Sequence, residues 1–167
     1  MITLTLPSTP VIKIKPSEQA LFAAFLKDDI AVGNIKHHIN LYHLGLENGW
    51  AVYIGRYENP LAKERVKAFP LPKWSNPYLV DKWQEERDGD RAQVLQKYYD
   101  YLMQRPQLIE EAKSKLRGKI LFCHCKSATL THYDSPNYRC HGDILREIVK
   151  GTDLNCYGKG LEALWEF

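Results

Sequence analysis

The length and composition of the chain are those of a single globular domain. It has 167 residues, of which 44% are hydrophobic, and this is enough to bury one core. No run of about 18 apolar residues occurs, and the N-terminus lacks the charged start and apolar centre of a secretory signal. We therefore expect a cytoplasmic protein with no membrane partner. The formal net charge of +3 is small for this length, so charge alone does not favour nucleic acid as a ligand.

The first third of the chain predicts an N-terminal extension, residues 1–33, followed by two strands. Alternation in ITLTL and VIKIK is typical of short strands, and a helix is expected from Ser17 onward. The segments HHINLYHLG and WAVYIGR are rich in β-branched and aromatic residues and are separated by the turn-forming LENG. They predict two strands, the second of which ends at Gly55 and Arg56.

A proline-rich loop and two helices are expected next. The segment from Tyr57 to Lys82 contains four prolines, which interrupt helices and strands, while its aromatic residues favour an ordered loop. The stretch DGDRAQVLQKYYDYLMQ has apolar residues at helical spacing, with Asp90 as the expected cap. The stretch PQLIEEAKSKLRG predicts a second helix, which begins at Pro106 and ends at Gly118.

The order of elements in the last third predicts an α/β fold. KILFCHC is a short apolar run of the kind that forms a buried strand, and CHGDILREIVKG predicts a helix closed by Gly151. Because this strand, a loop and this helix follow a pair of helices, we predict a single Rossmann-like three-layer domain with a partly parallel sheet. The α/β core would comprise residues 34–150, and residues 151–167 would form a C-terminal tail.

Three cysteines and three histidines fall between Cys123 and Asp143, and zinc binding is one chemistry that suits them. In a cytoplasmic protein, clustered cysteines point more often to metal or thiol chemistry than to disulfides. Cys123, Cys125, Cys140 and His141 make a four-ligand set for zinc, which takes sulfur and nitrogen ligands tetrahedrally. The spacing differs from that of the usual structural zinc motif, whose ligands lie about two to four residues apart on a turn.

A reactive thiol and a plain packing role are the alternatives to metal binding. Cys123 or Cys140 would be a nucleophile or half of a redox pair, with His141 or His132 as its base. The N–H groups at the start of the predicted helix favour a thiolate there. Alternatively, the cysteines behave as small hydrophobic residues that fill the space between strand and helix. The residues themselves leave all three roles open.

The ends of the predicted strands indicate a pocket for an anionic ligand. In parallel α/β sheets, ligands bind at the carboxyl ends of the strands, beside helix N-termini. Arg56 follows one such strand and Lys126 follows the other. If the two strands are parallel neighbours, this edge would bind a nucleotide or another small phosphorylated molecule. Neither a Gly-x-Gly-x-x-Gly motif nor a P-loop is present in the sequence.

Several motifs follow one another along the chain: VYIGR, KWSNPYLV, an Arg-led helix RAQVLQKYYDYL, LRGKILFCHC and CHGDILREI. Together they resemble the bacterial and phage family known as domain of unknown function 4326. The activity of the family is unsettled, so the resemblance indicates which residues match the family's motifs and does not indicate a reaction. The matching residues are Gly55, Arg56, Asn76, Pro77, Arg91, Cys123, Cys125, Cys140, His141, Gly142 and Asp143. His124 stands where the family has tryptophan, and the loop from Lys126 to Arg139 is longer than the family's.

Three functional expectations follow, and the residues do not decide whether the protein is an enzyme. The first is a nucleotide or phosphate pocket, whose ligand-binding residues would be Arg56, Ser75, Asn76, Arg91, Lys126 and Asp143. Cys123, Cys140 and His141 would be its reactive groups. The second is a zinc-stabilised binding module without catalysis. The third, which the small net charge disfavours, is nucleic-acid binding through the basic run from Lys113 to Lys126.

Overall fold

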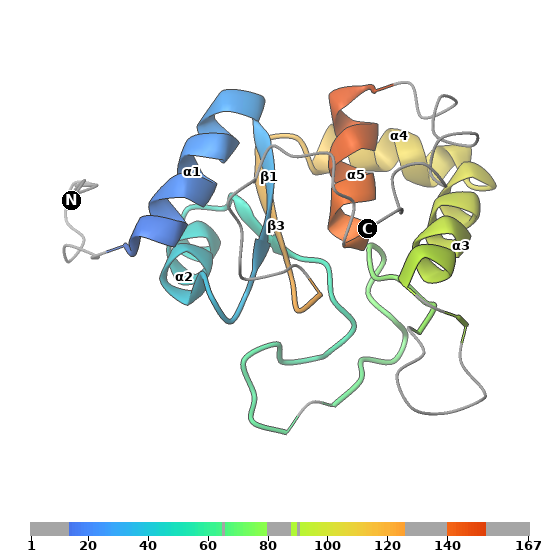
Figure 1. Cartoon of the computed structure of the whole chain (residues 1–167), viewed down its shortest axis with the longest axis horizontal. Helices are drawn as coiled ribbons and strands as arrows, with labels where there is room; N and C mark the ends of the chain where they lie inside the picture. The colour runs from blue at the N-terminus through green and yellow to red at the C-terminus, as the bar shows by residue number, and fades with distance from the viewer. Residues whose placement is uncertain (1–13, 65, 80–87, 90, 126–139, 153–167) are drawn as a thin grey trace.

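Five helices and three strands make up the described part of the chain, which comprises residues 14–64, 66–79, 88–89, 91–125 and 140–152 of a computed structural model (Figure 1). In chain order the elements are α1 (Pro16–Asp28), β1 (Ile30–Asn34), α2 (Ile39–Glu47), β2 (Ala51–Tyr53), α3 (Arg91–Met103), α4 (Pro106–Lys115), β3 (Lys119–Cys123) and α5 (His141–Lys150). None of the described helices is long and apolar enough to cross a membrane.

The three strands form a parallel sheet in the order β1-β3-β2. Ile120 of β3 lies opposite Ala31 on one side and Ala51 on the other. The central strand β3 is buried from Ile120 to Cys123, as its continuous apolar run predicts for a parallel strand that is covered on both faces. The α/β class and the parallel pairing of β2 with β3 are therefore confirmed.

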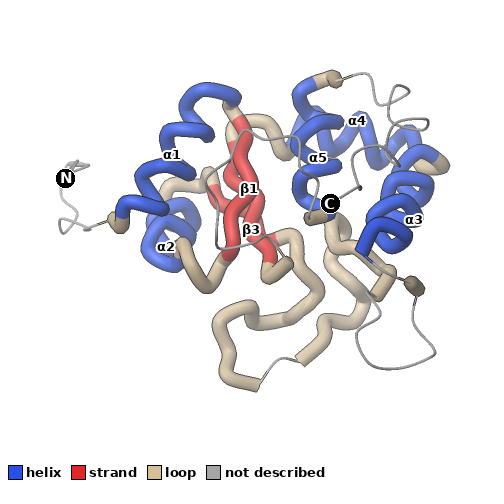
Figure 2. The backbone as a smooth tube through the Cα atoms, in the orientation of Figure 1, coloured by secondary structure: helices blue, strands red, loops and turns tan. Residues whose placement is uncertain are grey.

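Helices cover both faces of the sheet, and each face has its own apolar core (Figures 1 and 2). On the side of α1 and α2, Ile120 and Phe122 pack with Leu21, Leu41 and Tyr42. On the opposite side, the alternate residues Leu121 and Cys123 of β3 pack with apolar residues of α3, α4 and α5. The alternation of side chains along β3 thus sends Cys123 toward α5.

The strand predicted over residues 37–45 is wrong, because Ile39–Glu47 is helix α2. Leu41 and Leu44 lie one helical turn apart and are both buried. The start of α2 is capped by Glu18, whose carboxylate accepts hydrogen bonds from the backbone N–H groups of Asn40 at 2.9 Å and Leu41 at 3.2 Å. This cap comes from more than 20 residues earlier, so the local pattern of β-branched and aromatic residues does not reveal it.

The predicted N-terminal extension contributes a strand to the sheet. The expected helix is present as α1. This helix is followed by β1, a strand that the sequence did not predict. Strand β1 crosses the predicted boundary between extension and core at residue 33, and it pairs with β3. The strand predicted in ITLTL lies outside the described residues, as do the first three residues of VIKIK, and its last two residues, Ile14 and Lys15, form no strand.

The elements predicted in the second half of the chain are confirmed with small changes in their ends. Helix α4 begins at Pro106, and Gly151 closes α5 in the left-handed conformation with φ 74°. Strand β3 ends at Cys123 and does not continue to Cys125. The expected cap Asp90 and the tail from residue 153 lie outside the described residues.

We expect Glu18→Gln to lower the free energy of unfolding by about 1–3 kcal/mol, because the fully buried carboxylate accepts hydrogen bonds from three backbone N–H groups. Urea unfolding followed by circular dichroism measures the change. The matched control is Glu47→Gln at the exposed end of α2, which should change stability by less than about 0.5 kcal/mol. Equal effects of the two substitutions would show that Glu18 is not a stabilising cap.

Candidate metal centre and adjoining pocket

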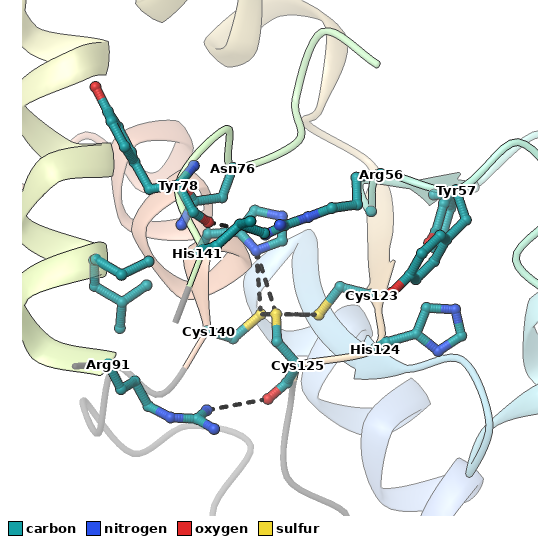
Figure 3. Close-up of a pocket in the computed structure, with 15 residues that line it drawn as sticks. Arg56, Tyr57, Asn76, Tyr78, Arg91, Cys123, His124, Cys125, Cys140 and His141 are labelled. Atoms are coloured by element: carbon teal, nitrogen blue, oxygen red, sulfur yellow. Dashed lines mark hydrogen bonds between the residues drawn. The ribbon is translucent and has the colours of Figure 1, made fainter. Parts of the chain in front are cut away.

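The end of β3 and the start of α5 bring three cysteine sulfurs together (Figure 3). The Sγ atoms of Cys123 and Cys140 are 2.8 Å apart, those of Cys125 and Cys140 are 2.9 Å apart, and those of Cys123 and Cys125 are 3.2 Å apart. These separations exceed the roughly 2.05 Å of a disulfide bond, and all three cysteines are free. The three thiols therefore form one compact cluster.

The glycine that follows His141 allows α5 to approach the sheet this closely. A Cβ atom at Gly142 would lie 2.8 Å from Val32 Cγ1 and 2.9 Å from Ile54 Cδ1, closer than such atoms pack. Cys140 is the residue that precedes the helix, and its sulfur accepts a hydrogen bond from the Gly142 backbone N–H at 3.3 Å. The Cys-His-Gly order thus places the Cys140 sulfur at the positive end of α5 and against Cys123.

His141 connects the cysteine cluster to the end of β2. Its Nδ1 lies 3.2 Å from the Cys125 sulfur and 4.0 Å from the Cys140 sulfur, while its Nε2 lies 2.9 Å from the carbonyl oxygen of Ile54. Because a carbonyl oxygen only accepts, the proton of a neutral His141 ring is on Nε2. The Nδ1 lone pair then faces the sulfurs, which is the tautomer that a metal ligand needs.

The three thiols differ in exposure and in pKa. Cys123 and Cys140 are fully buried, whereas Cys125 is exposed. Hydrogen bonding with Cys123 and Cys140 holds the pKa of the Cys125 thiol well below its usual value, and burial raises the pKa of the Cys140 thiol well above it. Burial lowers the pKa of His141, but the Cys125 thiolate and the hydrogen bond to the Ile54 carbonyl oxygen together outweigh this effect, so the pKa is raised overall.

The donor atoms of this cluster suit a metal ion. Three close cysteines can hold a metal, and sulfur and imidazole nitrogen are the donors that zinc takes. A tetrahedral zinc with Zn–S bonds of about 2.3 Å keeps its sulfurs roughly 3.8 Å apart. The three sulfurs need to separate by only about 1 Å or less to admit the ion. The unusual spacing of the motif therefore does not prevent the three sulfurs from meeting.

A cavity of about 330 Å³ adjoins the cysteine cluster at the carboxyl end of the sheet. It is lined by the end of β2 and the residues after it, by the loop at Asn76 and Tyr78, by the start of α3, and by the cysteine cluster with His141 (Figure 3). This is the edge at which the sequence predicts a ligand pocket, and its volume lies at the lower end of the range for small-molecule sites, about 300–1,000 Å³.

Three of the predicted ligand-binding residues line this cavity. The Arg56 guanidinium donates to the Tyr78 carbonyl oxygen at 2.9 Å, and the Asn76 side-chain oxygen accepts from the Tyr78 N–H at 2.9 Å. The Arg91 guanidinium donates to the Cys125 carbonyl oxygen at 3.4 Å. The structure thus brings Arg56, Asn76 and Arg91 together with the cysteines, although they come from three separate parts of the chain.

Two other predicted ligand-binding residues, Ser75 and Asp143, are not among the described residues that line the cavity. The Ser75 hydroxyl donates to the Pro72 carbonyl oxygen at 2.7 Å, which fixes the loop. Asp143 is fully buried and forms an ion pair with Arg146 at 3.7 Å. Lys126 and His132 lie outside the described residues.

The aromatic residues of the cavity were not predicted as site residues. The ring of His124 makes edge-on contacts with Tyr53 and Tyr57, with ring centroids 5.9 Å and 5.5 Å apart. Gly55 has no side chain at the point where the Tyr53 ring folds over the backbone, and a Cβ atom there would overlap that ring. The two tyrosines flank the Ile-Gly-Arg motif in the sequence, and this flanking is the signal that could have identified them.

The basic run predicted for nucleic acid is largely engaged in local contacts. Lys113 pairs with Glu110 and Lys115 pairs with Glu111 on the exposed side of α4. The Arg117 guanidinium donates to the Val149 carbonyl oxygen at 2.8 Å. None of these three residues lines the cavity beside the cysteines.

In metal-free protein, iodoacetamide should alkylate Cys125 before Cys123 and Cys140, because the pKa of its thiol is lowered and the residue is exposed. The pH at which its alkylation reaches half of the maximal rate should lie below the pKa of a free cysteine. Peptide mass spectrometry at a series of pH values identifies the modified residue. Cys140 should react only after denaturation. Alkylation of Cys140 before Cys125 in folded protein would contradict the geometry of the cluster.

Comparison with known proteins places most of this region in one family. No curated protein and no solved structure matches the chain. A family model described as Domain of unknown function (DUF4326) matches residues 39–151, which is more than half of the chain and includes β2, β3, α3, α4 and α5. The match therefore covers every element that contributes to the cysteine cluster and its cavity, and the chain belongs to the DUF4326 family.

Proposed function

We propose that the protein binds one zinc ion through Cys123, Cys125, Cys140 and His141. The observation that carries the proposal is the convergence of three sulfurs and one imidazole nitrogen at the point where β3 ends and α5 begins. The Ile54 carbonyl oxygen supports it further, because it accepts from Nε2 and so keeps Nδ1 available to a metal. Backbone partners of this kind are a usual accompaniment of metal-bound histidines.

Four protein ligands would fill the coordination shell of zinc, as they do at structural zinc sites. The ion would connect residues that lie on either side of the segment 126–139, so that metal binding and folding are linked. Its role in this proposal is to fix the carboxyl edge of the sheet. The proposal names no catalytic step for the ion.

Protein purified without added metal should contain about one zinc per chain by elemental analysis, and Cys125→Ser or Cys140→Ser should lose it, because each removes a ligand. Cobalt in place of zinc should give the intense near-ultraviolet absorption of cobalt–thiolate bonds. His141→Ala should weaken cobalt binding, whereas the matched control His43→Ala, an exposed histidine of α2, should not. Metal-free protein with no cobalt spectrum and full stability would overturn the zinc proposal.

A second proposed function is that the cavity beside the cysteines binds a small phosphorylated ligand, such as a nucleotide. Two arginines that come from different elements, Arg56 and Arg91, both line it. Guanidinium groups suit phosphate, since their N–H donors match its oxygens. The first turns of α3 and α5 also reach this cavity, with Arg91 and His141 among the lining residues, and the helix dipoles favour negative charge there.

A thermal-shift screen followed by calorimetry should detect binding of at least one compound among phosphate, AMP, ADP and CMP. Arg56→Ala should reduce that affinity at least tenfold, a loss of about 1.4 kcal/mol. Arg105→Ala is the matched control, because Arg105 is exposed and does not line this cavity. No response to any compound of the panel would reject the phosphate pocket. Oligonucleotide binding that survives Arg56→Ala and weakens steeply with salt would instead favour nucleic acid.

A further inference from the structure

We infer that metal occupancy of the cysteine cluster controls the affinity of the adjoining cavity for anions, and that anion binding tightens the metal in return. This inference rests on the proposed function, since it requires both a metal and an anion to bind. It goes further in treating them as two coupled sites. Three sets of contacts link the residues that would hold the metal to the residues that would hold the anion.

The first link is the His141 ring, one nitrogen of which faces the cysteine cluster while the other contacts the backbone that leads to Arg56. Its Nδ1 faces the sulfurs of Cys125 and Cys140, and its Nε2 contacts the Ile54 carbonyl oxygen at 2.9 Å. Ile54 is fully buried, and its own N–H donates to the Phe122 carbonyl oxygen at 2.9 Å. Arg56 follows two residues later. A metal that fixes the ring therefore also fixes the backbone from which Arg56 projects.

The second link is the contact between Arg91 and the main chain of Cys125. The guanidinium donates to the Cys125 carbonyl oxygen at 3.4 Å (Figure 3). Cys125 is also the most exposed of the three sulfur ligands, and it lies beyond the end of β3, where no strand hydrogen bonds hold it. Coordination of its sulfur would fix the position of this carbonyl oxygen, and with it one of the partners that orient Arg91.

The third link passes through Tyr98 to the loop that holds Arg56. The fully buried Tyr98 ring lies edge-on to His141, with centroids 5.4 Å apart, and its hydroxyl donates to the Trp74 carbonyl oxygen at 2.9 Å. Further along this loop, the Tyr78 carbonyl oxygen accepts from Arg56. The His141 ring thus packs against Tyr98, which fixes the loop, and the loop in turn fixes the Arg56 guanidinium.

These contacts predict positive coupling. A bound metal restricts His141 and Cys125, so an anion that binds afterwards loses less conformational freedom in ordering Arg56 and Arg91. Thermodynamic linkage requires that the anion raise the metal affinity by the same factor. Coupling of this kind typically changes affinity by about 5- to 150-fold.

The test measures AMP affinity by calorimetry in zinc-loaded and metal-free full-length protein, and zinc affinity by chelator competition with and without AMP. We expect AMP to bind about tenfold more tightly to the zinc-loaded protein, and zinc to bind tighter by the same factor when AMP is present. The chelator competition starts from folded, zinc-loaded protein, so it reports coupling even if the metal-free chain unfolds.

Two variants test the route of the coupling. His141→Cys supplies a fourth sulfur ligand but removes the ring nitrogen that contacts Ile54, so zinc should still bind while the effect of AMP on zinc affinity falls several-fold. Arg91→Gln should also reduce this effect, whereas Arg105→Gln, an exposed arginine outside the cavity, should leave it unchanged. Full coupling in both His141→Cys and Arg91→Gln would overturn the inference.

The outcomes separate this inference from the proposed function. Absence of zinc, or absence of AMP binding to zinc-loaded protein, would count against the proposed metal centre or the proposed pocket for this nucleotide, and the coupling would fall with it. Binding of both, with equal AMP affinity in zinc-loaded and metal-free protein, would leave the proposed function intact and reject the coupling alone.

Discussion

The close approach of α5 to the carboxyl end of the sheet is the constraint on which the rest of the site depends. It requires a residue without a side chain at position 142, because the helix start lies against Val32 of β1 and Ile54 after β2. The same approach places Cys140 beside Cys123 and gives His141 a backbone partner at Ile54, just after β2. A side chain at position 142 would therefore disturb the packing of α5, the cysteine cluster and the orientation of the His141 ring.

The position of β3 in the middle of the sheet explains why a buried cysteine, Cys123, is among the residues that line the cavity. A central parallel strand is apolar on both faces, and Cys123 belongs to the core cluster that β3 shares with α3 and α5. Cysteine packs in the core as a small apolar residue, and its sulfur can still act as a metal ligand. The two arginines reach the same cavity from the periphery of the sheet: Arg56 belongs to the segment that follows β2, and Arg91 is the first residue of α3.

Sequence reasoning identified the elements whose signals are local and missed those that depend on distant partners. Strand β3 and helix α5 follow from a short apolar run and from Gly151, whereas α2 depends on a cap from Glu18, which no local pattern contains. Of the residues expected to bind a ligand, Arg56, Asn76 and Arg91 line the cavity. The polar atoms of Ser75 and Asp143 instead bond within the loop and within α5. The contact of His141 with a backbone carbonyl leaves no trace in the sequence, since any residue at position 54 would offer the same oxygen.

The unequal exposure of the three sulfurs described above implies an order of events for any ion that exchanges at this cluster. Cys123 and Cys140 are sealed from solvent, so Cys125 would be the first sulfur that an arriving ion meets and the last that a departing ion leaves. The rate of exchange would then depend mainly on the freedom of the chain around Cys125 to move outward. The carbonyl oxygen of Cys125 accepts a hydrogen bond from Arg91. A substitution of Arg91 would therefore change the residence time of the ion more than its affinity.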